Sequence, residues 1–600
     1  MFNERISMAN ERILLFNERI QKATIIRRIF MKKPVIQFEN YSFQYRSQTA
    51  PTLHEINLTI HDGEKVLIVG PSGSGKSTLG HCLNGLVPFS YKGQVSGSLK
   101  ISGEDAMDLD IFTLSKKVGT VLQDPDGQFI GLTVAEDIAF ALENDCAPQK
   151  QMFKRIAEVS KMVEMEEYLD SSLHHLSGGQ KQRVSLAGVM VDDVEILLFD
   201  EPLANLDPAT GKYAIELIDR IQRETNKTVV IIEHRLEDVL HCPVDRIIVV
   251  DDGRIIGDMT PDELLASPLL EQCSVREPLY VKAAKYAGCK ITPDMQPAHP
   301  DTFRIDSCKA QLADWFTNVN PPQPRAKTEV VLEVKDITFG YKPGQRTIHD
   351  VSFSIEKGEM VSIVGKNGAS KSTLSKLICG FEKPSSGRIY YRGQDISGDT
   401  IKERAARIGM VMQNPNQMIS KQMIYDEVAL GLVIRGVPEN EIKERVLKTL
   451  KICGLYPFRN WPISALSFGQ KKRVTIASIL VLEPEVLILD EPTAGQDFRH
   501  YTEIMEFLVE LNRHGVTIIM ITHDMHLMLE YTPRAIVMAS GRKIADDTAV
   551  HVLADATIIK QANLKETSLF ELAERAGFGE PKEFVRRFIA YDRGVRQKWQ

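Results

Sequence analysis

The chain has 600 residues, which at about 150 residues per domain points to three or four domains. Its 73 basic and 80 acidic residues give a net charge of −7, which argues against a protein that chiefly coats a nucleic-acid backbone, so no nucleic-acid partner is expected. The eight cysteines form no CxxC pair, which fits neither a disulfide framework nor a zinc or iron–sulfur site. No stretch approaches the roughly 18 uncharged apolar residues that a membrane helix needs.

Residues 1–33 form an N-terminal extension that contains FNERI twice, at 2–6 and 16–20, and NERI at 10–13. One interpretation is an amphipathic arm, since apolar and charged residues recur near helical spacing. The other is a tandem duplication or a start assigned too early, with Met31 as the true beginning. We favour the second because the first strand-like segment begins only at Val35.

Three motifs occur twice, each pair 290 residues apart. Gln123 in VLQDPDGQ returns as Gln413, Ser177 in LSGGQKQRV returns as Ser467, and Asp200 in ILLFDEP returns as Asp490. A common offset for independent motifs indicates a duplicated domain. The two halves are expected to span 34–257 and 329–545.

The segment 258–328 between the halves contains nine prolines from Pro261 to Pro324, which indicates an irregular connector. A weak echo between 279–288 and 569–577 adds the prediction of a small helix after each half. The tail, 546–600, is either a helical element that locks the halves together, which we slightly favour, or a solvated appendage.

Short apolar runs alternate with helical patterns in both halves. KVLIVG at 65–70 and MVSIVG at 360–365 precede glycine-rich loops, and similar runs end at Asp200, Asp490 and two histidines. Such runs are typical of buried parallel strands, which place functional residues at their carboxyl ends. Each half is therefore predicted to be α/β with a mainly parallel sheet.

The first glycine-rich loop, GPSGSGKST, follows a strand and opens a helix, as a phosphate-binding loop must. Its backbone N–H groups would cradle phosphates, Lys76 would neutralise phosphate oxygens, and Ser77 would offer a hydroxyl to Mg²⁺. The candidate nucleotide-binding residues here are Gly70, Pro71, Ser72, Gly73, Ser74, Gly75, Lys76, Ser77 and Thr78.

The second loop, GKNGASKST, has Ser370 where the pattern expects a glycine. One interpretation is that the Cβ of Ser370 weakens the nucleotide site. The other is that the Cβ is tolerated, because φ is negative at the border of the helix. We favour the second, because the pattern's other residues, Lys371, Ser372 and Thr373, are present. The candidate residues are Gly365, Lys366, Asn367, Gly368, Ala369, Ser370, Lys371, Ser372 and Thr373.

Adjacent carboxylates end one strand in each half, Asp200–Glu201 and Asp490–Glu491. Such a pair can divide labour, with the aspartate in the Mg²⁺ shell and the glutamate polarising the attacking water. A carboxylate pair that follows a phosphate loop in both halves is a strong sign of a nucleotide-hydrolysing site.

The order of these motifs, with LSGGQ or LSFGQ before a helix and a later strand that ends in histidine, resembles the ATP-binding cassette family over about 440 residues. The resemblance implies two tandem P-loop cassettes, each an α/β core with a helical signature subdomain. It implies signature residues that bind ATP, namely Ser177, Gly178, Gly179, Gln180, Ser467, Phe468, Gly469 and Gln470.

The resemblance also implies individual roles. Tyr45 and Tyr341 would stack on adenine, Glu201 and Glu491 would be catalytic, and His234 and His523 would contact the γ-phosphate. Gln123 and Gln413 would reach Mg²⁺ and the attacking water, and Asp207 and Asp497 would lie in loops that cross between cassettes. The implied Mg²⁺ ligands are Ser77, Gln123, Asp200, Ser372, Gln413 and Asp490.

Cassettes of this family pair head to tail, and here both could pair within one chain. One composite site would then combine the loop at 70–78 with LSFGQ, and the other would combine the Ser370 loop with LSGGQ. Each site carries one departure from the usual pattern, so we expect both glutamates to matter, though unequally.

The segment 123–144, QDPDGQFIGLTVAEDIAFALEN, closely resembles the ATPases of energy-coupling factor importers, and 413–432 is a looser version. By resemblance, the chain would work at the cytoplasmic membrane face with a transmembrane scaffold and a small substrate-binding membrane protein. A groove beside the two glutamines would receive the scaffold. The alternatives are a soluble twin-cassette ATPase that acts on ribosomes and a sugar-importer ATPase.

Overall fold

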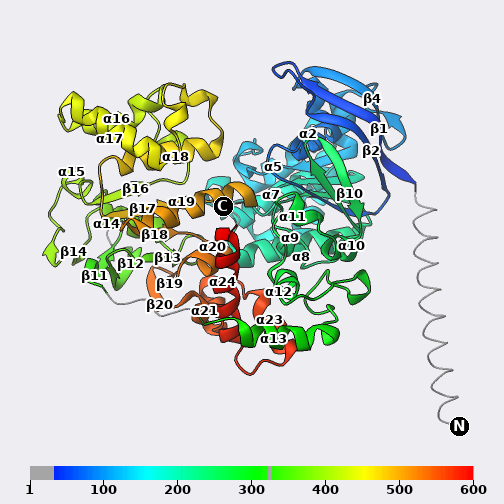
Figure 1. Ribbon diagram of the computed structural model, residues 1–600. Coiled ribbons are helices and arrows are strands. Elements are labelled where there is room, and N and C mark those ends of the chain that lie inside the picture. Colours follow the sequence, from blue (N-terminus) through cyan, green and yellow to red (C-terminus); the bar gives the residue numbers. More distant parts are fainter. Residues whose placement is uncertain (1–32, 205, 322–327, 343, 599–600) are drawn as a thin grey trace, which may run out of the picture.

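The computed structural model describes residues 33–204, 206–321, 328–342 and 344–598. Two lobes, one from each half of the sequence, stand above a helical body, as Figure 1 shows. The FNERI repeats and most of the PPQP run lie outside the described residues. The helical body combines segments from the connector and from the tail, which are far apart in sequence.

The core of the first cassette is a six-stranded sheet in the order β10-β9-β3-β8-β7-β6. Strand β3 (Lys65–Val69) lies between β8 (Thr228–Ile232) and β9 (Arg246–Asp251) and pairs with both in parallel. Every residue of β3 and β8 is buried, because the sheet is covered on both faces. The remaining strands are β6 (Val118–Val121), β7 (Ile196–Asp200) and the antiparallel edge strand β10 (Arg254–Met259).

The second cassette repeats this order as β16-β17-β18-β13-β19-β20. Its strands are β13 (Met360–Val364), β16 (Ile408–Val411), β17 (Val486–Asp490), β18 (Thr517–Ile521), β19 (Arg534–Ala539) and β20 (Arg542–Asp547). Parallel pairing of β13, β16, β17, β18 and β19 confirms the predicted α/β class.

A smaller antiparallel sheet accompanies each core sheet. In the first cassette its order is β2-β1-β4-β5, and in the second it is β12-β11-β14-β15. The bounds are β1 (Pro34–Tyr45), β2 (Leu53–His61), β4 (Gly93–Ile101), β5 (Glu104–Asp105), β11 (Val330–Phe339), β12 (Ile348–Glu356), β14 (Ser386–Tyr391) and β15 (Gln394–Asp395).

Three helices form a subdomain between β6 and β7, and three more form its counterpart between β16 and β17. They are α5 (Val134–Asn144), α6 (Gln149–Met162), α7 (Gly178–Met190), α16 (Ile424–Ile434), α17 (Glu439–Ile452) and α18 (Phe468–Leu480). The other helices of the cassettes are α2 (Lys76–Leu83), α3 (Leu86–Phe89), α4 (Ile111–Lys117), α8 (Pro208–Thr225), α9 (Leu236–Val239), α14 (Lys371–Cys379), α15 (Ile401–Arg404), α19 (Phe498–Arg513) and α20 (Met525–Tyr531).

The helical body contains α10 (Pro261–Ala266), α11 (Leu269–Gln272), α12 (Leu279–Tyr286) and α13 (Lys309–Asn318) from the connector. From the tail it contains α21 (Ala549–Val552), α22 (Ala556–Ala562), α23 (Ser568–Ala576) and α24 (Pro581–Lys598). Phe584 and Phe588 of α24 are fully buried, and Phe584 packs edge-on against Trp315 of α13. The tail is thus part of a core shared with the connector, and the idea of a solvated appendage is wrong.

Within the described ranges, no helix combines the length and apolar character needed to cross a membrane. The same residues contain no cluster of three or more histidine, cysteine and acidic side chains arranged to hold a metal ion.

Candidate functional site

The first glycine-rich loop joins the carboxyl end of β3 to α2. Gly70 has φ of 154°, and a Cβ there would lie 2.0 Å from the carbonyl oxygen of Val250, so this position accepts only glycine. Lys76 is buried, and its Nζ donates to the carbonyl oxygens of Gly70 (2.9 Å) and Pro71 (2.8 Å). These two hydrogen bonds hold the backbone of the loop against the side chain of Lys76. Burial lowers the pKa of Lys76, and the nearby Glu201 opposes that shift.

The second loop has the same arrangement, because Lys371 Nζ donates to the carbonyl oxygens of Gly365 (2.7 Å) and Lys366 (3.1 Å). Ser370, however, has φ of 71°, so the expected negative φ at this position is wrong. Its hydroxyl donates to the carbonyl oxygen of Thr347 at 3.0 Å. This local hydrogen bond offsets part of the cost of a left-handed residue that carries a Cβ.

The two strand-end aspartates face these loops. One carboxylate oxygen of Asp200, Oδ1, is buried and without a hydrogen-bond partner among the described residues. Burial and the neighbouring Glu201 charge raise the pKa of Asp200 to about 6. In the second cassette, burial raises the pKa of Asp490, and a hydrogen bond from Ser372 opposes the shift. A buried, unpaired carboxylate oxygen beside the loop that carries the Ser77 hydroxyl fits a hard divalent cation such as Mg²⁺.

Glu201 lies at the centre of a hydrogen-bonded group in the first cassette. Its Oε2 accepts from Gln123 Nε2 at 2.6 Å, and its Oε1 lies 2.8 Å from His234 Nε2. Burial raises the pKa of Glu201, but His234 and the Lys76 charge outweigh that effect and leave the pKa below its ordinary value. The residue is therefore an anion at neutral pH, as a proton acceptor must be. Its φ of 49° is left-handed, a strained geometry of the kind found at functional sites.

Glu491 occupies the corresponding place in the second cassette, with φ of 45°. Its Oε1 lies 2.7 Å from His523 Nδ1, and its Oε2 accepts from the Thr522 hydroxyl at 3.2 Å. The position before the histidine differs between the cassettes, because Glu233 stands where Thr522 stands. Glu233 is buried and accepts from the amide nitrogens of Leu203 (3.1 Å) and His234 (2.7 Å). Each glutamate thus has a histidine partner, but the second partner is Gln123 for Glu201 and Thr522 for Glu491.

Of the candidate adenine-stacking tyrosines, Tyr45 ends β1 and Tyr341 lies just after the end of β11. The Tyr45 hydroxyl lies 3.0 Å from Thr78 Oγ1, and the Tyr341 hydroxyl lies 3.3 Å from Thr373 Oγ1. Each ring therefore stands beside the helix that follows its own phosphate loop. Tyr341 is 54% exposed, which leaves its ring accessible to a nucleobase.

The cassettes contact each other through aspartates that cap the helices after the carboxylate pairs. Asp497 caps α19, and its Oδ2 accepts from the amide nitrogen of Ser72, in the other cassette's phosphate loop, at 2.6 Å. In the pseudo-symmetric contact, Asp207 Oδ2 lies 3.4 Å from the amide nitrogen of Asn367. The head-to-tail pairing within one chain therefore has one short and one long crossing contact.

Both signature segments begin helices, α7 and α18, through reciprocal serine and glutamine caps. Phe468 is the first residue of α18 and is 43% exposed. A Cβ at the equivalent Gly178 would lie 3.6 Å from the nearest side chain, so a larger residue is tolerated there. Gly179 is different, since a Cβ would lie 2.5 Å from Thr210 Cγ2.

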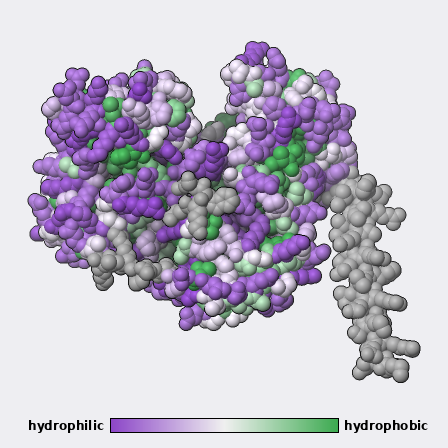
Figure 2. All heavy atoms as spheres, viewed as in Figure 1, coloured by the Kyte–Doolittle hydropathy of each residue, from purple (hydrophilic) through white to green (hydrophobic). Residues whose placement is uncertain are grey.

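The residues that line the cleft around the Ser370 loop come from both cassettes. The cleft around the Ser370 loop, about 1010 Å³, is bounded on the side of the first cassette by Gln123, Asp124, Asp126 and Ala204. Among the described residues, the LSGGQ residues Ser177, Gly179 and Gln180 line a different pocket, together with Asn563 of the tail. Among the described residues, the lining of the cleft around the Ser370 loop therefore does not include the LSGGQ residues. Figure 2 shows the hollow between the two lobes.

The sequence reading missed two buried polar residues, Glu233 and Lys472. Lys472 is 1% exposed and donates to the carbonyl oxygens of Met412 and Gln413, both at 2.8 Å. It thereby fixes the backbone of a candidate Mg²⁺ ligand. The signal was present in the repeat, since LSFGQKK carries lysine where LSGGQKQ carries glutamine.

A family model described as "ABC transporter" matches residues 53–204 and 348–494. An ABC transporter ATP-binding protein from Clostridium perfringens is 59% identical over 565 residues, which cover 94% of this chain and 100% of that protein. The chain belongs to the ABC transporter ATP-binding proteins. Its general activity is therefore ATP hydrolysis coupled to transport, and its cassettes bind ATP.

Further proteins and family models match the whole chain or parts of it. An ABC transporter ATP-binding protein from Enterococcus faecalis is 60% identical over 571 residues, or 94% of this chain and 100% of that one. A second model, described as "ATP-binding cassette cobalt transporter", matches 267–339, and a model described as an AAA domain matches 459–530. A solved structure of CbiO1 from Clostridium perfringens, part of the ABC transporter complex CbiONQ, is 39% identical, covers 39% of this chain and 95% of that chain, and has a TM-score of 0.36.

Proposed function

We propose that this ABC ATPase drives uptake of a vitamin, a vitamin precursor or a metal ion through separate membrane subunits of an energy-coupling factor importer. Its partners would be a transmembrane scaffold and a small substrate-binding membrane protein, which would hold it peripherally at the cytoplasmic membrane face. The resemblance of 123–144 to such ATPases supports this proposal. So does the match of 267–339 to a cobalt-transporter model, since most of this segment belongs to the connector and not to the cassettes.

Exposed apolar side chains on the helical subdomains carry the proposal. Leu132 is 78% exposed and Ile130 is 62% exposed, and both follow Gln123 in the loop before α5. In the second cassette, Ile434 at the end of α16 is 71% exposed. Exposed apolar residues that are close neighbours, as Ile130 and Leu132 are, mark an interaction site. We assign the loop before α5 to the scaffold.

The proposed chemistry follows from the site geometry. Lys76 and Lys371, with the loop amides, would bind the phosphates of ATP, and Glu201 or Glu491 would accept a proton from the attacking water. His234 and His523 would hold the glutamates and approach the γ-phosphate. Mg²⁺, when bound, would neutralise phosphate charge, held in the first cassette by Ser77, Gln123 and Asp200 and in the second by Ser372, Gln413 and Asp490.

Affinity purification of the tagged full chain from detergent-solubilised membranes, followed by mass spectrometry, tests this proposal. We expect recovery of a multi-helix scaffold and a second small membrane protein. The variant L132D should lose both, because it places a charge in the docking surface. The matched control I256D changes a 40% exposed residue on the edge strand β10 and should retain both. Recovery of ribosomal proteins without membrane subunits would overturn the proposal in favour of a soluble factor.

A further inference from the structure

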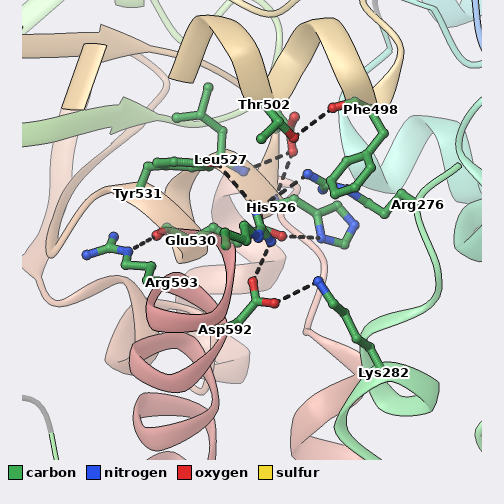
Figure 3. Close-up of polar contacts among 12 residues, drawn as sticks. Arg276, Lys282, Phe498, Thr502, His526, Leu527, Glu530, Tyr531, Asp592 and Arg593 are labelled. Carbon is green, nitrogen blue, oxygen red and sulfur yellow. Dashed lines mark hydrogen bonds and ion pairs between the residues drawn. The ribbon is translucent and has the colours of Figure 1, made fainter. Parts of the chain in front are cut away.

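The segment between α11 and α12 sends one arginine, Arg276, into the second cassette. Its guanidinium carbon lies 4.8 Å from the ring centroid of Phe498 and 4.4 Å from that of Tyr501. Its Nη2 lies 3.4 Å from Glu530 Oε2. Figure 3 shows the arginine reaching from the connector to α19 and α20. One side chain thus contacts two helices of the other cassette through their aromatic and acidic residues.

The ion pair continues into the tail. Glu530 is 2% exposed, and Arg596 of α24 also pairs with it, at 3.0 Å. Arg596 in turn pairs with Asp592 at 2.5 Å, and Lys282 of α12 reaches the same aspartate at 2.7 Å. The buried charges are therefore balanced only when connector, tail and second cassette are assembled. Arg276 and Arg596 outweigh the effect of burial and lower the pKa of Glu530 to about 2.

The helices that Arg276 holds carry two groups of the nucleotide sites. Phe498 directly follows Asp497, which bonds the Ser72 amide of the first phosphate loop. Glu530 lies near the end of α20, whose cap Asp524 directly follows His523. A shift of the first turn of α19 would move Asp497 away from Ser72.

In the part of the chain that the structure describes, the residues that Arg276 contacts are not repeated in the first cassette. Counted from the carboxylate pairs and the histidines, the first-cassette positions equivalent to Phe498, Tyr501 and Glu530 are Pro208, Gly211 and His241. Pro208 and Gly211 have no aromatic ring and His241 has no carboxylate, so the rings and the acid that Arg276 contacts have no counterpart at these positions. The first cassette's helix α9 is instead tied to the body by Asp238 and Lys565, at 2.7 Å. Arg276 therefore packs against the helix whose cap, Asp497, makes the shorter of the two contacts between the cassettes.

We propose that Arg276 is a positioning residue for ATP hydrolysis at the site that contains Ser72, Lys76 and Glu201. Through Phe498 it fixes Asp497 against the first phosphate loop, so the helical body sets the geometry of this site. This role of Arg276 does not depend on the proposed membrane partners, because it concerns ATP hydrolysis by the chain itself.

The test compares R276Q with R587Q in the full-length protein. Arg587 is a matched control, since it also stacks on an aromatic ring, Phe316 (4.5 Å), and pairs with an acid, Glu583 (3.0 Å), but these partners belong to the connector and the tail. ATPase kinetics are measured in the E491Q background, which leaves only Glu201 as a candidate base, and in the E201Q background. Hydrogen exchange of the peptide that contains Ser72 is a readout independent of activity.

In the E491Q background we expect R276Q to lower kcat five- to tenfold with KM for ATP within twofold, and to accelerate exchange at Ser72. R276K should recover part of kcat, because it keeps the charge. In the E201Q background the loss should stay below threefold, and R587Q should change neither readout.

An unchanged kcat and unchanged Ser72 exchange in R276Q, or equal effects of R587Q, would overturn the proposal. Should R276Q fail to fold, F498L serves instead, since it keeps an apolar residue but removes the ring that the guanidinium faces. F498L must then show the same loss of kcat and the same faster exchange, and normal values in both would refute the role.

Discussion

The amide nitrogen of Ser72 lies 2.6 Å from Oδ2 of Asp497, although the two residues are 425 positions apart in the sequence. The equivalent contact, from Asn367 to Asp207, is 3.4 Å long. A hydrogen bond to a charged acceptor weakens as it lengthens, so the two sites of this duplicated chain are unequal in the described conformation.

We predict that D497N lowers the ATPase rate more than D207N does. Loss of the charge weakens the contact to the phosphate-loop amide, and about tenfold in kcat corresponds to roughly 1.4 kcal/mol. The amide side chain retains an oxygen for the helix cap, so the fold should persist. Steady-state ATPase kinetics of D497N and D207N test this prediction. Equal reductions of kcat in the two variants would contradict it.

Both glutamates are expected to contribute to turnover, with Glu201 contributing more, because its site has the intact phosphate loop and the short crossing contact. E201Q should reduce the overall rate more than E491Q, and the double variant should abolish hydrolysis. Pre-steady-state phosphate release from each variant measures the two contributions. If E491Q left ATPase activity and transport intact, the second glutamate would have no role.

Ser370 provides a test of backbone strain. S370G should keep nucleotide affinity at the second site within threefold and stability within about 1 kcal/mol, because relief of the left-handed strain offsets the lost bond to Thr347. S370A keeps the strain but loses the bond, and it should lower stability by about 1 kcal/mol. Urea unfolding and nucleotide titration measure both effects. A large gain in affinity for S370G would show instead that the serine weakens the site.

Lys472 gives the protein a pH dependence of definite sign. Burial lowers its pKa to about 8 from 10.5, and the Asp490 and Glu491 charges oppose the shift. Between these pH values the unfolded chain holds a proton that the folded chain has released, so stability rises with pH. Relative to K472Q, the free energy of unfolding of the wild type should rise by about 3 kcal/mol between pH 8 and 10.5 and be flat below pH 7. Urea unfolding across this range checks the slope.

The neighbouring variant K471Q is the control for this titration, since it removes a lysine of the same helix whose side chain is not buried. Its difference from the wild type should not follow the same curve. A flat difference for K472Q would mean that the buried lysine keeps its proton through the whole range.

The sequence by itself determined the α/β cassettes, because strands such as β3 and β13 are short, mainly apolar runs that a doubly covered sheet buries along their whole length. It also singled out Lys76, Glu201 and His234, since their spacing from the strands places them at one sheet edge. Such patterns can be recognised from residues that are close together in the sequence. The repeat at an offset of 290 residues shows each pattern twice.

Only the tertiary structure decided how the halves meet. The φ of Ser370, the partners of Glu201 and the burial of Lys472 depend on residues brought together from distant segments. The same holds for Arg276, which sequence alone leaves as one charge in a proline-rich connector. Its contacts with Phe498 and Glu530 arise because the connector and the tail fold together against the second cassette. The buried carboxylate of Glu530 needs nearby positive charges, and these come from distant segments that only the folded chain brings together.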